Sequence, residues 1–81
     1  MYLRYTARFR RSYARAPVTI RRALDRRVLF LADNLTHPSL HAKKYDEAQD
    51  IWQARASGGW RFYFRIKGDT YVLLDIMAHP K

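Results

Sequence analysis

The strongest hydrophobic pattern in the chain predicts a helix in its first half. Apolar residues recur there at spacings of three and four, at Ile20, Leu24, Val28, Leu31 and Leu35. Pro17 suits the first turn of this helix, and the turn-forming residues 34–38 end it. The opposite side contains Arg21, Arg22 and Arg26, which we interpret as a solvated face.

The first residues predict a short strand followed by a short helix. Residues 2–5 are of strand-forming types. Thr6 is then placed to cap a helix in which Phe9 and Tyr13, four residues apart, fall on one side.

The second half of the chain alternates between apolar and polar residues, which predicts three strands, at residues 51–56, 60–66 and 70–78. Residues 39–50 show no clean period, and we expect an extended loop there. The expected order is β-α-α-β-β-β. This is a single α+β domain over residues 1–81, with two N-terminal helices packed on one face of a small antiparallel sheet.

Alternation divides each of the three strands into a core set and a set on the open face of the sheet. The core sets are Trp52, Ala54 and Ala56; Trp60, Phe62, Phe64 and Ile66; and Val72, Leu74 and Ile76. The open face is expected to contain Gln53, Arg55, Arg61, Tyr63, Arg65, Asp75 and His79, with Lys81 at its rim and with Tyr71, Leu73 and Met77 on the same side of the last strand.

Loop length decides whether these sets coincide, because a slip of one residue exchanges the two faces. A three-residue loop at Ser57-Gly58-Gly59 pairs Arg55 with Arg61, so that both apolar sets meet the helices.

Loop length matters equally in the second hairpin. A three-residue loop at Lys67-Gly68-Asp69 pairs Arg61 with Asp75 and Phe62 with Leu74. A two-residue turn at Gly68-Asp69 would instead place Asp75 opposite Phe62, and we therefore expect the longer loop.

The net charge of the chain indicates the kind of partner that it binds. Sixteen Lys and Arg against seven Asp and Glu leave +9, which predicts a polyanionic partner: nucleic acid, an anionic membrane surface or an acidic protein. The chain has no cysteine, so disulfides and thiolate metal sites are excluded. No segment is apolar for long enough to cross a bilayer, the first residues do not resemble a secretory signal, and we expect a cytoplasmic protein.

The predicted pairing of Arg55 with Arg61 is unfavourable in a purely structural sheet, because like charges across a rung repel. A bound phosphate would account for it, since guanidinium groups contact phosphate in bidentate fashion. Alternatively, both arginines turn into water, or Asp75 neutralises Arg61.

Several segments together resemble the RelE/ParE toxins of bacterial toxin-antitoxin modules. They are Lys43-Lys44-Tyr45, Ile51-Trp52-Gln53-Ala54-Arg55, Gly59-Trp60-Arg61-Phe62-Tyr63-Phe64 and the closing apolar strand that ends at His79. For RelE-like members the resemblance implies a ribosome-dependent endoribonuclease that cuts messenger RNA without metal.

The resemblance also suggests site residues. Arg61 matches the family's strand arginine after an aromatic residue, and Arg55 stands where a strand lysine is common. Lys81 falls near a C-terminal arginine, and His79 is similar to a histidine that several relatives have at the end of the last strand. Gln53 departs from the pattern, because a second lysine often stands there.

We expect Arg61 and Arg55 to hold the phosphate, and His79 to act as general acid or base. Lys43, Lys44, Lys81 and Arg65 would contact the RNA backbone, and Tyr63 would stack on a base or orient the site. His37 and His41 have no partner at ligand spacing, so we expect neither a metal nor another cofactor.

Two further functions are compatible with the sequence: a ParE-like inhibitor that binds DNA gyrase without chemistry of its own, and a non-toxic RNA-binding module. Under either toxin function the resemblance implies a cognate antitoxin with an acidic, partly disordered segment. Messenger RNA and the ribosome are the additional partners expected for the ribonuclease.

Overall fold

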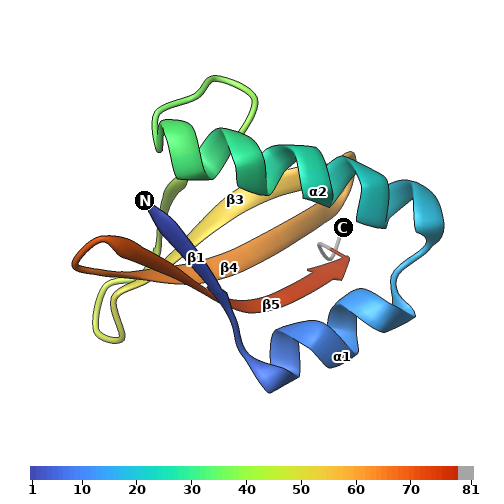
Figure 1. Ribbon diagram of the computed structural model, residues 1–81, viewed down its shortest axis with the longest axis horizontal. Helices are drawn as coiled ribbons and strands as arrows, with labels where there is room; N and C mark the ends of the chain where they lie inside the picture. Colours follow the sequence, from blue (N-terminus) through green and yellow to red (C-terminus); the bar gives the residue numbers. More distant parts are fainter. Residues whose placement is uncertain (79–81) are drawn as a thin grey trace.

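A five-stranded sheet with two helices makes up the part of the chain that the computed structural model describes, residues 1–78 (Figure 1). The elements are β1 (Tyr2–Tyr5), α1 (Ala7–Arg15), α2 (Val18–Asp33), β2 (Lys43–Asp46), β3 (Ile51–Ser57), β4 (Trp60–Lys67) and β5 (Thr70–Ala78). The strand order is β1-β5-β4-β3-β2, in which β1 runs parallel to β5 and all other neighbours are antiparallel. The predicted α+β fold is confirmed.

Helix α1 begins where its sequence predicts. The Thr6 hydroxyl accepts a hydrogen bond from the Phe9 backbone N–H at 3.1 Å and donates one to the Leu73 carbonyl at 2.9 Å, so the cap also joins the helix to β5. The helix stops just before Pro17, whose ring disfavours helical backbone in the residue ahead of it. Phe9 is buried against the sheet and its ring lies between the rings of Tyr5 and Tyr13.

Helix α2 covers the sheet with the predicted apolar stripe, and it crosses over β3 in Figure 1. Leu24, Val28 and Leu31 are buried, while Ile20 and Leu35 are half-buried at the margin of the core. They pack against a core that contains Ala54, Ala56, Phe62, Phe64, Tyr71, Leu73 and Ile76. In the described part of the chain, no helix is both long and apolar enough to span a membrane.

Strand β2 lies within the segment expected to be a loop, so that expectation was wrong. Lys43 pairs with Gln53 and Lys44 with Trp52 of β3, and a bulge at Tyr45 interrupts the ladder before Asp46. A strand of four residues with a bulge has no run of alternation for the sequence to reveal.

The register of the first hairpin is confirmed: Arg55 pairs with Arg61 and Ala54 with Phe62. The loop itself is shorter than expected. Ser57 pairs with Trp60 across a two-residue turn, and an irregularity between Arg55 and Ser57 takes up the extra residue. The turn begins at Gly58, whose φ of +48° is left-handed and favours glycine.

The register of the second hairpin was predicted incorrectly. Lys67 pairs with Thr70 across a two-residue turn, and Leu74 forms a bulge between the Phe64–Leu73 and Tyr63–Asp75 pairs. The bulge exchanges the faces of β5 partway along the strand. Tyr71 and Leu73 therefore enter the core in place of Val72 and Leu74, whereas Ile76 lies in the core as predicted.

Candidate nucleic-acid interface

The face of the sheet turned away from the core contains two rungs of mostly polar side chains. One rung joins Lys43, Gln53, Tyr63 and Asp75 across four strands. The next joins Arg55, Arg61 and Met77. Their neighbours along each strand, such as Phe62 and Ile76, are buried on the other face, so these two rungs make up the centre of the open face.

The two arginines of the second rung are not neutralised by Asp75. This carboxylate pairs with Arg8 of α1, at 3.1 Å from its Nε, and accepts the Ile76 backbone N–H at 2.8 Å. Asp75 lies opposite Tyr63, one rung away from Arg61, because the two-residue turn and the Leu74 bulge together shift the expected register by two residues. The expected pairing of Asp75 with Arg61 is therefore wrong.

The hydrogen bonds of the two arginines are few. Arg61 donates to the carbonyls of Gly58 and Trp60, at 3.0 and 3.2 Å. The Nε of Arg55 is buried and has no hydrogen-bond partner among the described residues. Such an orphaned donor is uncommon in folded proteins, and this Nε can accept a further hydrogen-bond partner.

A hollow of about 420 Å³ lies over this rung, lined by His41, Ala42, Lys43, Gln53, Arg55 and Arg61. Lysine and arginine side chains from β2, β3 and β4 converge on it, and its lining residues include no carboxylate. Converging cations with free N–H groups bind phosphate oxygens. His41 also lines this hollow. No pattern in the sequence indicates this, because His41 reaches the hollow only through the path of the loop before β2.

A second hollow of about 430 Å³ adjoins the other rung and includes Tyr45, Tyr63, Arg65 and Asp75. The ring of Tyr45 meets that of Tyr63 edge to face at 4.9 Å. Tyr63 is only 7% exposed, and burial raises the pKa of its hydroxyl, whereas Tyr45 is 61% exposed. Tyr45, rather than the predicted Tyr63, therefore presents a free ring on which a base could stack.

The structure gathers most of the predicted site residues and separates one of them. Lys43, Arg55, Arg61, Tyr63 and Arg65 share the open face, where Arg65 Nε donates to the Gln49 carbonyl at 3.1 Å. Lys44 points to the other side, where it pairs with Asp50 and lies 4.9 Å over the Trp52 ring. His79 and Lys81 lie outside the described residues.

Other histidine and acidic side chains form no comparable site. Within residues 1–78, no group of three or more His, Cys, Asp or Glu side chains is placed to hold a metal ion. His37 stacks on Phe30 at 4.1 Å, and its Nδ1 accepts the Ser39 backbone N–H, so its ring holds the loop in place.

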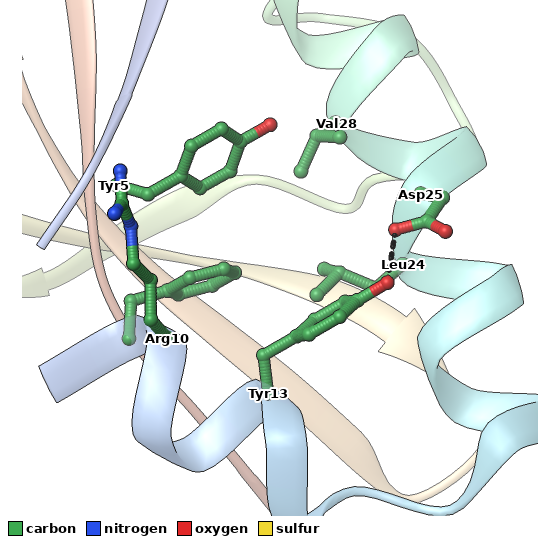
Figure 2. Close-up of a pocket in the computed structure, with 7 residues that line it drawn as sticks. Tyr5, Arg10, Tyr13, Leu24, Asp25 and Val28 are labelled. Carbon is green, nitrogen blue, oxygen red and sulfur yellow. Dashed lines mark hydrogen bonds between the residues drawn. The ribbon is translucent and has the colours of Figure 1, made fainter. Parts of the chain in front are cut away.

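A third hollow of about 260 Å³ lies on the helical side, between β1, α1 and α2 (Figure 2). Apolar side chains and rings make up most of its lining, together with Arg10 and Asp25, and Tyr13 donates a hydrogen bond to Asp25 at 2.8 Å. This bond raises the pKa of the Tyr13 hydroxyl. Its lining suits an apolar group and not a phosphate, so it is separate from the basic face.

Comparison with solved structures relates this fold to a group of bacterial and archaeal toxins, although no protein-family model and no curated protein matches the chain in sequence. A YoeB/ParE toxin from Agrobacterium tumefaciens superposes with a TM-score of 0.81 at 14% identity, covering 99% of this chain and all of that one. The isolated RelE toxin of E. coli gives a TM-score of 0.77 at 12% identity, covering 99% and 85%.

The toxin-antitoxin complex RelBE2 from Mycobacterium tuberculosis gives a TM-score of 0.67 at 26% identity, covering 98% of this chain and 96% of that one. These matches extend over nearly the whole chain, as the resemblance in sequence does. The chain therefore has the fold of the RelE/ParE toxin superfamily, which confirms the resemblance.

Proposed function

We propose that this protein is the toxin of a toxin-antitoxin module and that it cleaves messenger RNA on the ribosome. Its structural neighbours are toxins of such modules, which supports the first half of the proposal. The second half is supported by the chemistry of the open face, above all by the rung formed by Arg55 and Arg61.

This rung is unfavourable without a ligand. Directly opposed like charges destabilise a sheet by roughly 0.2–1 kcal/mol, and a buried unpaired donor costs about 1–3 kcal/mol. Arg55 contributes to both effects, because it faces Arg61 and its Nε has no partner among the described residues. A phosphodiester in the adjoining hollow would accept that donor and offset the repulsion between the two arginines.

The same arrangement suits cleavage. When the 2′-hydroxyl of a ribose attacks the neighbouring phosphorus, negative charge builds up on the phosphate oxygens, and preorganised cations stabilise that charge. Arg55, Arg61 and Lys43 line one hollow and supply three such cations. Arg65 and the exposed ring of Tyr45 border the next hollow, where they would contact the adjoining nucleotide. His79 as general acid or base, and Lys81 as a backbone contact, stay predictions from the sequence.

An antitoxin is the protein partner that this proposal requires. Several neighbouring structures are complexes of a toxin with its antitoxin, among them the RelB-RelE complex of Methanococcus jannaschii. An acidic, partly disordered segment would complement the +9 charge of this chain and cover its basic face.

Controlled expression in a bacterium tests the proposal. We expect growth arrest in which incorporation of labelled amino acids falls before DNA synthesis does. The double variant Arg55→Gln/Arg61→Gln should abolish the arrest, because it removes the phosphate-binding charges. Arg22→Gln/Arg26→Gln, which removes two exposed charges from α2, is the matched control and should still arrest growth.

If the protein inhibited DNA gyrase instead, DNA synthesis would fall before the incorporation of amino acids. DNA breaks that require gyrase, with protein synthesis falling only afterwards, would contradict cleavage of messenger RNA. Harmless expression of the intact chain would contradict both toxin functions.

A further inference from the structure

The loop before β2 places His41 beside the arginine rung. The Arg55 backbone N–H donates to the Leu40 carbonyl at 2.7 Å, which continues the contact between β2 and β3 beyond the Lys43–Gln53 pair. His41 therefore lies next to Arg55 at the edge of the open face, and it lines the same hollow.

Three further contacts hold this loop in place. Leu40 is fully buried in the core, Arg27 of α2 donates to the Ser39 carbonyl, and the ring of His37 is stacked on Phe30. His41 itself is exposed, so its ring is accessible from solvent while its backbone is anchored on both sides.

The backbone at His41 is strained. Its φ of +47° lies in the left-handed region, which residues other than glycine occupy infrequently. Strain of this kind persists where the surrounding structure imposes it, and it concentrates at functional sites. The residue with this backbone also lines the hollow in which we place the phosphate.

We propose that His41 is the general base of the RNA cleavage, an inference that rests on the proposed function. The charged side chains that share its hollow are Lys43 on β2, Arg55 on β3 and Arg61 on β4. His41 also borders a fourth hollow, of about 500 Å³, together with His37. His41 is thus the one imidazole among the described residues that lines the hollow containing the two arginines.

In this step the neutral imidazole of His41 takes the proton of the ribose 2′-hydroxyl. The 2′-oxygen forms a bond to phosphorus, and the bond from phosphorus to the 5′-oxygen breaks. The leaving oxygen keeps the electron pair and takes a proton from water. The imidazolium returns its proton to the resulting hydroxide. The products are a 2′,3′-cyclic phosphate and a 5′-hydroxyl.

The rate of cleavage as a function of pH tests this assignment. The measurement uses the full chain in excess over messenger RNA bound to bacterial ribosomes, in a single turnover, between about pH 5 and 8, where an imidazole changes charge. The wild-type rate should rise with pH, because only a neutral imidazole takes the proton. His41→Asn should lower the rate by about 100-fold or more and remove the pH dependence.

Asparagine is chosen because it tolerates the left-handed backbone of residue 41. Arg22→Gln, at an exposed position on α2 that does not line the hollow, is the control. We expect Arg22→Gln to retain the wild-type rate and pH profile.

Binding of a 2′-O-methyl RNA oligonucleotide, which cannot be cleaved by this route, separates chemistry from folding. His41→Asn should bind it within about twofold of the wild type. A wild-type rate and pH profile in His41→Asn would overturn the proposal, as would equal loss of binding and cleavage. Absence of cleavage by the wild-type chain would instead contradict the proposed function itself.

Discussion

Arg55 shows how a single residue on the open face relates stability to binding. Its side chain faces another arginine, and its Nε is buried without a partner among the described residues. Both features are unfavourable in the free protein, and a bound anion would relieve them. We therefore propose that Arg55 serves binding more than it serves the fold.

Replacing Arg55 with methionine should consequently stabilise the protein. The substitution keeps a long apolar stem but removes the like charge and the orphaned donor, and we expect the free energy of unfolding to rise by about 1 kcal/mol. Urea denaturation at neutral pH measures this change. Arg22→Met, on the exposed side of α2, should change stability by less than about 0.5 kcal/mol. An Arg55→Met protein less stable than the wild type would show that the arginine contributes to folding after all.

Prediction from sequence worked for single residues where alternation alone decides the face. Arg55, Arg61 and Arg65 were placed correctly because each lies in an uninterrupted stretch of its strand. Tyr45 and His41 could not be found in this way. Tyr45 lies in a bulge, and His41 reaches the hollow through a left-handed loop residue, and neither feature has a periodic signature.

Among the helices and strands, the bulge at Leu74 has the largest effect on the site. Together with the two-residue turn, it makes Met77 rather than Asp75 the partner of Arg61, and the arginine rung is left without a carboxylate. The sequence around Gly68 allowed either a two-residue turn or a three-residue loop. A three-residue loop would avoid placing Asp75 opposite Phe62, whereas the protein uses the two-residue turn and shifts the register with the bulge at Leu74.

Thr6, the cap of α1, also forms a hydrogen bond with β5, and its contribution to the stability of the protein can be measured. Thr6→Ala removes both the hydrogen bond from Phe9 and the bond to the Leu73 carbonyl. We expect a loss of about 1–2 kcal/mol in the free energy of unfolding. Thr19→Ala, at an exposed position in α2 where no cap is lost, is the control in the same urea titration. Equal effects of the two substitutions would show that Thr6 does not join α1 to β5.

Over the molecule as a whole, the two faces of the sheet differ: one packs in the core and the other is open. The helical layer and the apolar residues of one face form the core, so the other face is free to gather charge. A net charge of +9 favours attraction of polyanions from a distance, and we propose that the arginine rung is where they bind. The fold class followed from the sequence because the helical stripe and the three long strands are strongly periodic.

Cleavage of messenger RNA by the basic face is tested by mapping the 5′ ends of cellular RNA after brief induction of this chain. We expect new 5′-hydroxyl ends inside translated coding regions, which disappear when translation initiation is blocked and in the Arg55→Gln/Arg61→Gln variant. Growth arrest by the wild-type chain with no new 5′-hydroxyl ends in messenger RNA would contradict the proposed ribonuclease function.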